Sequence, residues 1–149
     1  MEHIVDEKGL SQVAEEFIRN YPAVSDRATV IGLSGDLGSG KTAFVKAIAR
    51  TLGVAEAILS PTFVIAKFYQ LGDRLPWQTL VHVDAYRIEN PEELRALKWE
   101  EIVTDRRNLV MIEWPEQLGE FFPPDAPMLH FRFIDETHRE IKVPITVPI

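Results

Sequence analysis

The chain of 149 residues contains no cysteine. This absence excludes disulfide bonds, thiolate metal sites and cysteine nucleophiles. The sequence also lacks any apolar run approaching the ~20 residues that a membrane-spanning helix needs. Its first residues are charged and mixed, without the basic start and apolar core of a signal peptide. We therefore expect a cytoplasmic protein with no membrane partner.

Positive charge is also scarce. Lysine and arginine total 16 against 23 aspartate and glutamate residues, so the formal net charge is −7. A protein that binds a nucleic-acid backbone by itself usually shows a basic patch. Only Arg106-Arg107 stands out here, and it is an isolated pair. Direct contact with nucleic acid is therefore not expected, whereas an indirect connection through partner proteins stays open.

The segments that are present predict one domain over residues 1–149. Apolar runs of strand length alternate with segments of helical periodicity, which favours an α/β fold with three α/β/α layers and a mostly parallel central sheet. Ser11 is a plausible N-cap for the first helix, and Gly53 can end the second. We expect helices at 11–20, at 42–52 and after Asn90-Pro91, strands at 29–34, 63–69, 80–84 and 108–113, and a C-terminal β-hairpin of 128–134 and 140–145.

The glycine-rich segment that follows the apolar run 29–34 carries the strongest chemical signal. Its sequence, Gly35-Asp36-Leu37-Gly38-Ser39-Gly40-Lys41-Thr42, fits the P-loop pattern G-x-x-x-x-G-K-[ST] at every fixed position. Glycines let successive backbone N–H groups point at one anion, and the helix that begins there, with Ala43 next, directs its positive end at phosphate. Lys41 supplies a charge for the outer phosphates, and the Thr42 hydroxyl can bind Mg²⁺. We predict a P-loop NTPase domain.

A second group on the metal is expected at the carboxyl end of an apolar strand, where the ligand crevice of an open α/β sheet lies. Asp84 and Glu113 both follow such runs. We favour Glu113 as the Mg²⁺ group because its strand is the more uniformly apolar. Asp84 is then a candidate for positioning the attacking water or organising a loop. His82 shares a strand face with Asp84 and is interpreted as a hydrogen-bonded structural residue rather than a catalyst.

The guanine-reading motif N-K-x-D is absent, since the three asparagines are followed by Tyr21, Pro91 and Leu109. This absence favours ATP over GTP as the nucleotide. Three interpretations of the site stay open at this point. They are an ATPase, a small-metabolite or nucleoside kinase, and a nucleotide sensor that does not hydrolyse its ligand. No arginine-rich lid of the kind that kinases carry is evident.

Several further motifs, taken in order with the P-loop, resemble the TsaE family of bacterial ATPases, formerly called YjeE. They are Ser60-Pro61-Thr62-Phe63, His82-Val83-Asp84-Ala85-Tyr86-Arg87, Pro91-Glu92-Glu93-Leu94 and Glu113-Trp114-Pro115. The resemblance extends from Ser11 to about Lys142. It implies a part in forming threonylcarbamoyladenosine on tRNA, together with the transferase subunit TsaD and its companion TsaB. Separately, no arginine finger can be assigned from the sequence, so we expect hydrolysis by the chain alone to be slow and a partner to complete or stimulate the site.

The resemblance assigns roles at the matching positions. Lys41 and Thr42 contact phosphate and Mg²⁺, and Glu113 also serves Mg²⁺. Thr62 is the polar contact of a first switch segment, and Asp84 and Trp114 are needed for activity. The remaining part of the ATP site, the adenine-side wall, is assigned to Leu10, Ser11 and Arg139.

The sequence departs from the family pattern at two positions. The family often has glycine where Lys98 stands, so the region around it is expected to be shaped differently. It often has tyrosine at the position of Phe63, which removes a hydroxyl. Neither departure touches the residues assigned to phosphate.

Overall fold

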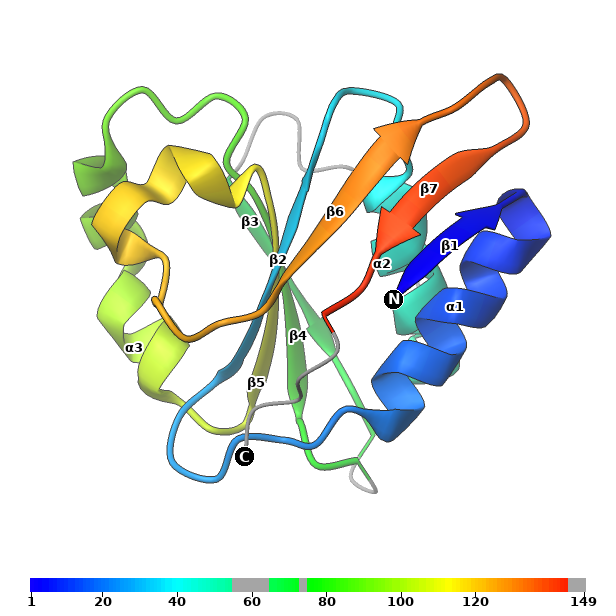
Figure 1. The fold of residues 1–149 in the computed structure, drawn as a ribbon. Helices are drawn as coiled ribbons and strands as arrows, with labels where there is room; N and C mark the ends of the chain where they lie inside the picture. Colours follow the sequence, from blue (N-terminus) through cyan, green and yellow to red (C-terminus); the bar gives the residue numbers. More distant parts are fainter. Residues whose placement is uncertain (55–64, 73–74, 145–149) are drawn as a thin grey trace.

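The computed structural model describes residues 1–54, 65–72 and 75–144. Seven strands form one sheet in the order β1-β7-β6-β2-β5-β4-β3. Figure 1 shows this sheet edge-on with helices on both sides, as the three-layer prediction requires. The elements are β1 (Glu2–Val5), α1 (Glu7–Asn20), β2 (Thr29–Gly35), α2 (Lys41–Thr51), β3 (Ala66–Gln70), β4 (Thr79–Asp84), the 3₁₀ helix η1 (Pro91–Leu97), α3 (Trp99–Thr104), β5 (Asn108–Glu113), the 3₁₀ helix η2 (Pro115–Phe121), β6 (Met128–Phe133) and β7 (Arg139–Lys142).

The four central strands are parallel, and the chain reverses direction at both edges of the sheet. Strand β2 pairs in parallel with β5 and β6, and β5 pairs in parallel with β4. The pairs β3–β4, β6–β7 and β1–β7 are antiparallel. The predicted hairpin is therefore confirmed. The expectation of a mostly parallel sheet holds for its centre, whereas the sheet as a whole is mixed.

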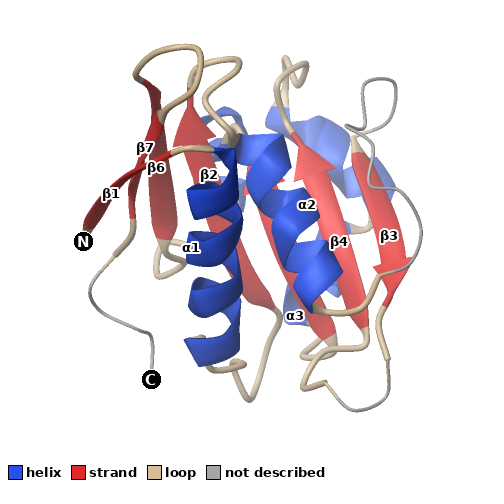
Figure 2. Cartoon of the chain, turned by 90° about the vertical axis from the view of Figure 1, so that its right-hand side faces the viewer, coloured by secondary structure: helices blue, strands red, loops and turns tan. Residues whose placement is uncertain are grey.

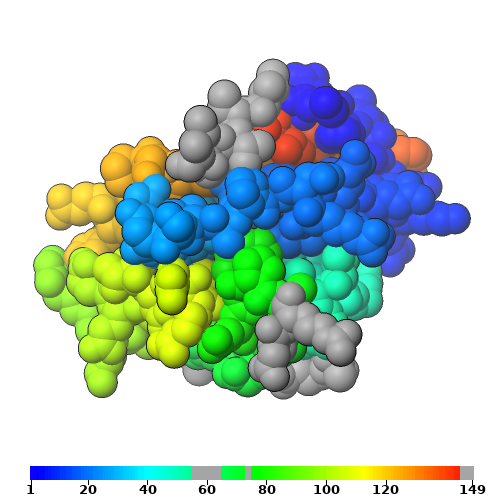
Figure 3. Space-filling model, turned by 90° about the horizontal axis from the view of Figure 1, so that it is seen from below, coloured from blue at the N-terminus to red at the C-terminus, as the bar shows by residue number. Residues whose placement is uncertain are grey.

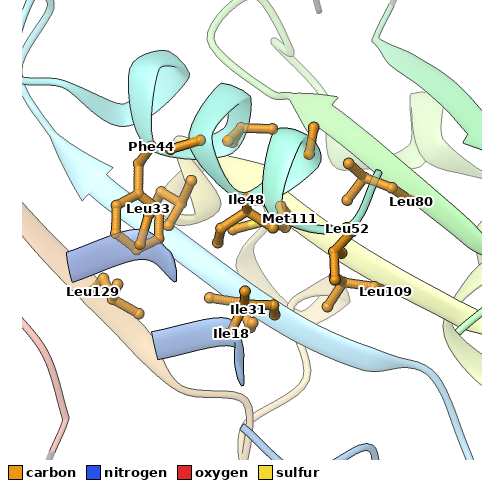
Figure 4. Close-up of a cluster of buried hydrophobic side chains, with 14 of the residues drawn as sticks. Ile18, Ile31, Leu33, Phe44, Ile48, Leu52, Leu80, Leu109, Met111 and Leu129 are labelled. Carbon is orange, nitrogen blue, oxygen red and sulfur yellow. The ribbon is translucent and has the colours of Figure 1, made fainter. Parts of the chain in front are cut away.

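The strands bury both faces, and their side chains alternate between two apolar clusters. Ile31 and Leu33 of β2 face α1 and α2, whereas Val30 faces the opposite layer of α3, η1 and η2. Figure 2 shows α1 and α2 lying side by side across one face. Figure 4 shows Phe44 and Ile48 of α2 packed over the sheet in the first cluster. Because successive side chains point to opposite faces, both faces of the central strands are packed. The loops at the carboxyl ends of these strands therefore rest on a well-packed sheet.

The first helix begins earlier than the sequence indicated. Helix α1 starts at Glu7, and its N-cap is Asp6, whose side chain accepts a hydrogen bond from the Gly9 N–H at 2.8 Å. The prediction of Ser11 as the N-cap is therefore wrong, because Ser11 lies inside the helix. The Asp6 cap supports the first turn of the helix, which contains Gly9. Strand β1, which the sequence analysis did not identify, precedes this cap at the edge of the sheet.

Helix α2 ends as Gly53 predicted. Leu52 is the C-cap, and Gly53 adopts a φ of 86°. The Gly53 N–H donates to the Arg50 carbonyl at 3.1 Å, and the Val54 N–H donates to the Ala49 carbonyl at 2.9 Å. This pair of bonds is the Schellman motif, which satisfies carbonyls at the end of the helix.

The segment after Asn90 forms two short helices joined at Lys98. Asn90 and Glu93 make a reciprocal capping box at the start of this segment. The helix that it starts is 3₁₀ and stops at Lys98, whose φ of 58° and ψ of 48° lie in the left-handed region. Helix α3 begins directly afterwards. This conformation explains why glycine suits the position, because glycine adopts a positive φ without a steric penalty.

The end of the molecule opposite the glycine-rich loop is closed by connecting segments. In Figure 3, which views this end, the chain between α1 and β2 runs across the middle. The Ala28 N–H donates to the Val103 carbonyl at 3.0 Å, and the buried Trp77 indole donates to the Thr29 hydroxyl at 3.0 Å. Within the described residues, no helix is both long and apolar enough to cross a membrane.

Candidate nucleotide-binding site

A large open cleft of about 1510 Å³ lies at the carboxyl ends of the central strands. Its wall includes the β2–α2 loop with helix α2, the ends of β4 and β5, the first turns of α1 and the β6–β7 turn. Its lining includes Asp6, Glu7, Lys8, Leu10, Ser11, the segment 37–43, Lys46, Arg50, Ile65, Asp84, Tyr86, Arg87, Glu113, Trp114, Glu136, Thr137 and Arg139. This is where an open α/β sheet binds its ligands.

Glycines shape the loop because its backbone approaches neighbouring elements closely. A Cβ on Gly35 would lie 2.4 Å from the Phe131 carbonyl oxygen, and one on Gly40 would lie 2.9 Å from the Leu10 Cδ1. Their φ values are 151° and 107°, which side chains rarely adopt. The loop is thereby fitted between β6 and α1, and α2 begins directly after Gly40.

The Lys41 side chain folds back over its own loop. Its ammonium donates to the Gly35 carbonyl and to the Asp36 carbonyl, the latter at 3.4 Å, and only 4% of the residue is exposed. The same Nζ lies 3.7 Å from the centroid of the Trp114 ring. Burial lowers the pKa of Lys41, and nearby carboxylates, Glu113 first among them, oppose that shift. The lysine is held inside the loop by carbonyl oxygens and an aromatic face.

Thr42 and Glu113 meet across the floor of the cleft. The Thr42 hydroxyl lies 2.9 Å from each carboxylate oxygen of Glu113. Glu113 ends the central strand β5 and is 3% exposed. Its Oε2 also lies 2.6 Å from Nε2 of His82, whose side chain on β4 is fully buried. The carboxylate is therefore fixed between the P-loop helix and the neighbouring strand.

Asp84 lies beside Glu113 at the end of the adjacent strand. The parallel register of β4 and β5 places the two residues directly opposite each other. Asp84 is half-buried and accepts a hydrogen bond from the Tyr86 N–H at 3.0 Å. Burial raises the pKa of the Asp84 carboxyl, the Tyr86 bond lowers it, and the charge of Glu113 raises it further. Two acidic side chains therefore face the same end of the cleft.

Trp114 adopts an unusual backbone conformation where β5 ends. Its φ of 62° is one of two positive values among the non-glycine residues that the structure describes, the other being at Lys98. Its N–H donates to the Leu33 carbonyl at 3.2 Å, and its ring packs 5.1 Å from that of Tyr86. Left-handed aromatic residues carry local strain and cluster at functional sites. The turn directs the indole under Lys41 instead of continuing the strand.

Arg139 connects the C-terminal hairpin to the P-loop. Its Nε donates to the Gly38 carbonyl at 2.7 Å, and its Nη1 donates to the carbonyls of Asp135 and His138. Its guanidinium also lies 4.5 Å from the centroid of the Phe133 ring. Leu10 reaches the same region from α1 through its contact with Gly40. Residues far apart in sequence thus border one wall of the cleft.

The structure brings most of the predicted site residues together. Leu10, Ser11, residues 37–43, Asp84, Glu113, Trp114 and Arg139 all line the cleft. Asp36 does not line it and takes part through its carbonyl, which accepts from Ser39 N–H and Lys41. Thr62, with the rest of the predicted switch segment Ser60 to Phe63, lies outside the described residues.

Sequence reasoning missed several charged residues of the cleft. Lys46 and Arg50 stand one turn apart on α2, and the Arg50 Nη2 donates to the Ser11 hydroxyl at 3.3 Å. Lys46 follows Thr42 by four residues and Arg50 follows Lys46 by four, and this spacing was a usable signal because it places neighbouring side chains on one helix face. Glu136 and Thr137 of the hairpin turn also line the cleft, and no local signal pointed to them.

The arrangement suits Mg²⁺ better than a metal held by protein alone. Across the described ranges, no three His, Cys, Asp or Glu side chains group so that they could hold a metal ion. Mg²⁺ prefers oxygen ligands and is usually bound through one or two carboxylates together with substrate phosphates. The Thr42 hydroxyl and the Glu113 carboxylate supply oxygens beside the glycine-rich loop. The residues therefore fit a magnesium ion that arrives with a nucleotide.

Comparison with known proteins connects this geometry to a family. Residues 4–141 match the family model described as threonylcarbamoyl adenosine biosynthesis protein TsaE. A protein of that name from Rickettsia bellii is 32% identical over 126 residues, covering 84% of this chain and 83% of the relative. One from Streptomyces coelicolor is 37% identical over 116 residues, covering 76% and 75%. The crystal structure of Bacillus subtilis YdiB superposes with a TM-score of 0.63 at 25% identity, covering 95% of this chain and 82% of that one.

Proposed function

The chain belongs to the TsaE family and takes part in threonylcarbamoyladenosine biosynthesis on tRNA, and we propose that it serves this pathway as a Mg²⁺-dependent ATPase with a P-loop NTPase domain. The observation that carries the proposal is the junction of Thr42 and Glu113 beside the glycine-rich loop. It combines a phosphate-binding turn with a strand-end carboxylate at hydrogen-bond distance. Those are the two halves of an NTPase metal site.

Phosphate binding is proposed for the loop and the start of α2. The N–H groups of the loop and the positive end of the helix attract an anion. Lys41 has carbonyl partners in the loop that a phosphate can replace, and its charge would neutralise the outer phosphates. Arg139 supports this geometry by holding the Gly38 carbonyl from the hairpin side.

Magnesium is proposed to bind through Thr42 and Glu113. When bound, the ion supplies charge neutralisation on the phosphate oxygens. Asp84, opposite Glu113 in the strand register, is proposed to position the attacking water. Burial raises the pKa of the Asp84 carboxyl, and the hydrogen bond from the Tyr86 N–H opposes that shift. Trp114 is proposed to hold the Lys41 side chain in place through its ring face.

Hydrolysis is proposed to need partner proteins. Among the described residues, the arginines of the cleft are Arg50, Arg87 and Arg139, and Arg139 already donates to three carbonyls. Family membership supports the transferase subunits TsaD and TsaB as the partners, with ATP turnover driving or resetting their complex. The predicted switch at Ser60 to Phe63 would link γ-phosphate loss to that complex.

The test is a comparison of ATP hydrolysis with and without TsaB and TsaD, combined with a screen for phosphorylated acceptors. We expect slow phosphate release by the chain alone and stimulation by the partners. Phosphate transfer that depends on an acceptor would instead indicate a kinase. Tight nucleotide binding without turnover under either condition would indicate a sensor. Recovery of the transferase subunits from a bacterial lysate in an ATP-dependent pull-down would support the pathway assignment.

Substitution of Glu113 separates binding from turnover. We expect Glu113→Ala to retain part of the nucleotide affinity and to lower Mg²⁺-dependent hydrolysis by orders of magnitude, because the loop remains while the metal loses a carboxylate. Calorimetric titration and steady-state phosphate release measure the two quantities. Glu100→Ala, which removes an exposed acid on α3, is the matched control. Unchanged turnover in Glu113→Ala would remove this residue from the site.

A further inference from the structure

His82 is the one buried imidazole in the described part of the chain, and it contacts the candidate metal carboxylate. Its Nε2 lies 2.6 Å from the Glu113 Oε2, and neither side chain is more than 4% exposed. A carboxylate only accepts hydrogen bonds, so the imidazole donates from Nε2. The second nitrogen, Nδ1, is buried and has no hydrogen-bond partner among the described residues.

The surroundings of His82 argue against a role in packing alone. Strand β4 directs His82 to the same face as Leu80, where α2 and the sheet form a continuous apolar cluster. A buried polar group without a partner costs free energy, and an aliphatic side chain would fill the same place without that cost. The imidazole therefore leaves Nδ1 unsatisfied while Nε2 contacts Glu113. Such local inconsistency is typical of a functional position.

The contact determines how the Glu113 carboxylate is oriented. Glutamate has three rotatable side-chain bonds, and the Thr42 hydroxyl lies equally far from both carboxylate oxygens, 2.9 Å from each. Thr42 alone does not distinguish one oxygen from the other. The His82 bond is made to Oε2 only and comes from a rigid strand paired in register with β5. It fixes the rotation of the carboxylate, and Oε1 remains with the Thr42 hydroxyl at 2.9 Å.

We propose that His82 is a positioning residue that orients the Glu113 carboxylate for Mg²⁺ in the nucleotide complex. The proposal rests on the ATP-dependent function proposed above. His82 contacts neither phosphate nor metal in this role and acts only through Glu113. Residues that orient metal ligands typically change metal affinity by about 10- to 100-fold when they are replaced. The expected effect is therefore on the metal and not on the nucleotide.

The test compares two amides of different reach at position 82. His82→Gln carries an N–H₂ group at a distance from Cα similar to that of Nε2, whereas the amide of His82→Asn is too short to reach Glu113. Binding of Mn²⁺ in the presence of saturating ADP, followed by the loss of the free-ion signal in electron paramagnetic resonance, gives a readout independent of turnover. We expect His82→Asn to weaken Mn²⁺ binding by about 10- to 100-fold. We expect His82→Gln to stay within about threefold of the wild type, on the same reasoning.

Two further measurements separate positioning from structural damage. ADP affinity in the presence of EDTA should be equal in the two variants, because His82 acts only through Glu113 and not on the nucleotide. His82→Leu, which keeps the volume and removes the donor, should match His82→Asn in Mn²⁺ affinity. Equal Mn²⁺ affinity in the Gln and Asn variants would overturn the proposal. Wild-type protein that binds no nucleotide would instead refute the proposed function, so the two failures are distinguishable.

Discussion

At the scale of single residues, the P-loop lysine has an aromatic neighbour. Lys41 Nζ lies over the Trp114 ring at 3.7 Å, and the indole is directed there by a left-handed backbone. A cation over a tryptophan face gains about 0.5–2 kcal/mol depending on its exposure to water. The same contact keeps the long lysine side chain from sampling other rotamers. In the proposed phosphate-binding role of Lys41, Trp114 would therefore reduce the side-chain entropy that is lost on binding.

Removal of Lys41 should abolish nucleotide binding. Lys41→Ala deletes the ammonium group that faces the loop carbonyls, and the fold should persist because the adjacent core of α2 is untouched. Isothermal titration calorimetry with ATP and Mg²⁺ measures the loss. Lys142→Ala, which removes an exposed lysine paired with Glu2 at the far edge of the sheet, is the control for charge. Wild-type ATP affinity in Lys41→Ala would refute the site assignment.

At the scale of elements, the junction of η1 and α3 depends on the conformation of one exposed residue. Lys98 has a φ of 58°, and left-handed geometry costs a residue with a side chain roughly 1–2 kcal/mol. Lys98→Gly removes this cost but adds the backbone entropy of glycine, which is about 0.5–1 kcal/mol. We expect a net stabilisation of up to about 1 kcal/mol in urea unfolding. Lys98→Ala changes the charge without relieving the backbone and should show no gain, so equal stabilities for the two variants would contradict this explanation.

The turn of the C-terminal hairpin is organised by one carboxylate. Asp135 accepts from the Thr137 N–H at 2.9 Å, the Thr137 hydroxyl at 3.0 Å and the His138 N–H at 2.8 Å. These bonds, the Thr137 backbone bond foremost, lower the pKa of Asp135 to about 2. The carboxyl is more acidic in the folded protein than in the unfolded chain, where its pKa is about 3.9. Its contribution to stability is therefore present above about pH 4 and is lost as the pH falls through about 2.

The pKa of Asp135 can be measured directly by an NMR titration of its side-chain carboxyl carbon. We expect a midpoint near 2 in the wild type. Thr137→Ala should move it upward, because that variant removes the hydroxyl donor while keeping both backbone donors. A midpoint near the unfolded value of about 3.9 in the wild type would show that the turn does not hold the carboxylate as described.

The elements also show which parts of the molecule the sequence predicts. Strand β5 was predicted with its observed bounds, because an uninterrupted apolar run such as Asn108–Glu113 fits a strand buried on both faces. Strand β1 was missed because it is a short edge strand in which only Ile4 and Val5 are apolar, and Ile4 is 63% exposed. Its place depends on pairing with β7, which no local pattern reveals.

The candidate site also has parts that the sequence predicts and parts that it does not. The glycine-rich motif is continuous in the sequence and could be recognised there, and the ends of two apolar runs indicated Asp84 and Glu113. The bond between His82 and Glu113 depends on the adjacency and register of β4 and β5, and these follow only from the assembled sheet. The approach of Arg139 to Gly38 joins residues 101 positions apart, and its hydrogen bond could not be derived from local periodicity.

At the scale of the whole molecule, the cleft is bordered by the first helix, the P-loop and the last hairpin. A ligand that contacts all three should stabilise the entire fold. A nucleotide present at 100 times its dissociation constant raises the free energy of unfolding by about 2.7 kcal/mol. For a chain of this size, that corresponds to a rise of about 5–10 °C in the thermal midpoint. Differential scanning calorimetry with ADP and Mg²⁺ measures the shift, and Lys41→Ala should show none. If ADP and Mg²⁺ leave the thermal midpoint of the wild type unchanged, the proposed placement of the ligand is contradicted.

The pairing of β1 with β7 also orders events while the protein is being made on the ribosome. Glu2 pairs with Lys142 and Val5 with Arg139, so the first strand has no partner until the last hairpin has been translated. The P-loop emerges about 100 residues earlier, which corresponds to ~5–20 s of elongation. During that interval, Gly38 lacks its contact with Arg139 and the start of α1 lacks its anchor on the sheet. The nascent chain therefore acquires the glycine-rich loop before the cleft around it is complete, and the contacts that close the cleft form only at the end of synthesis.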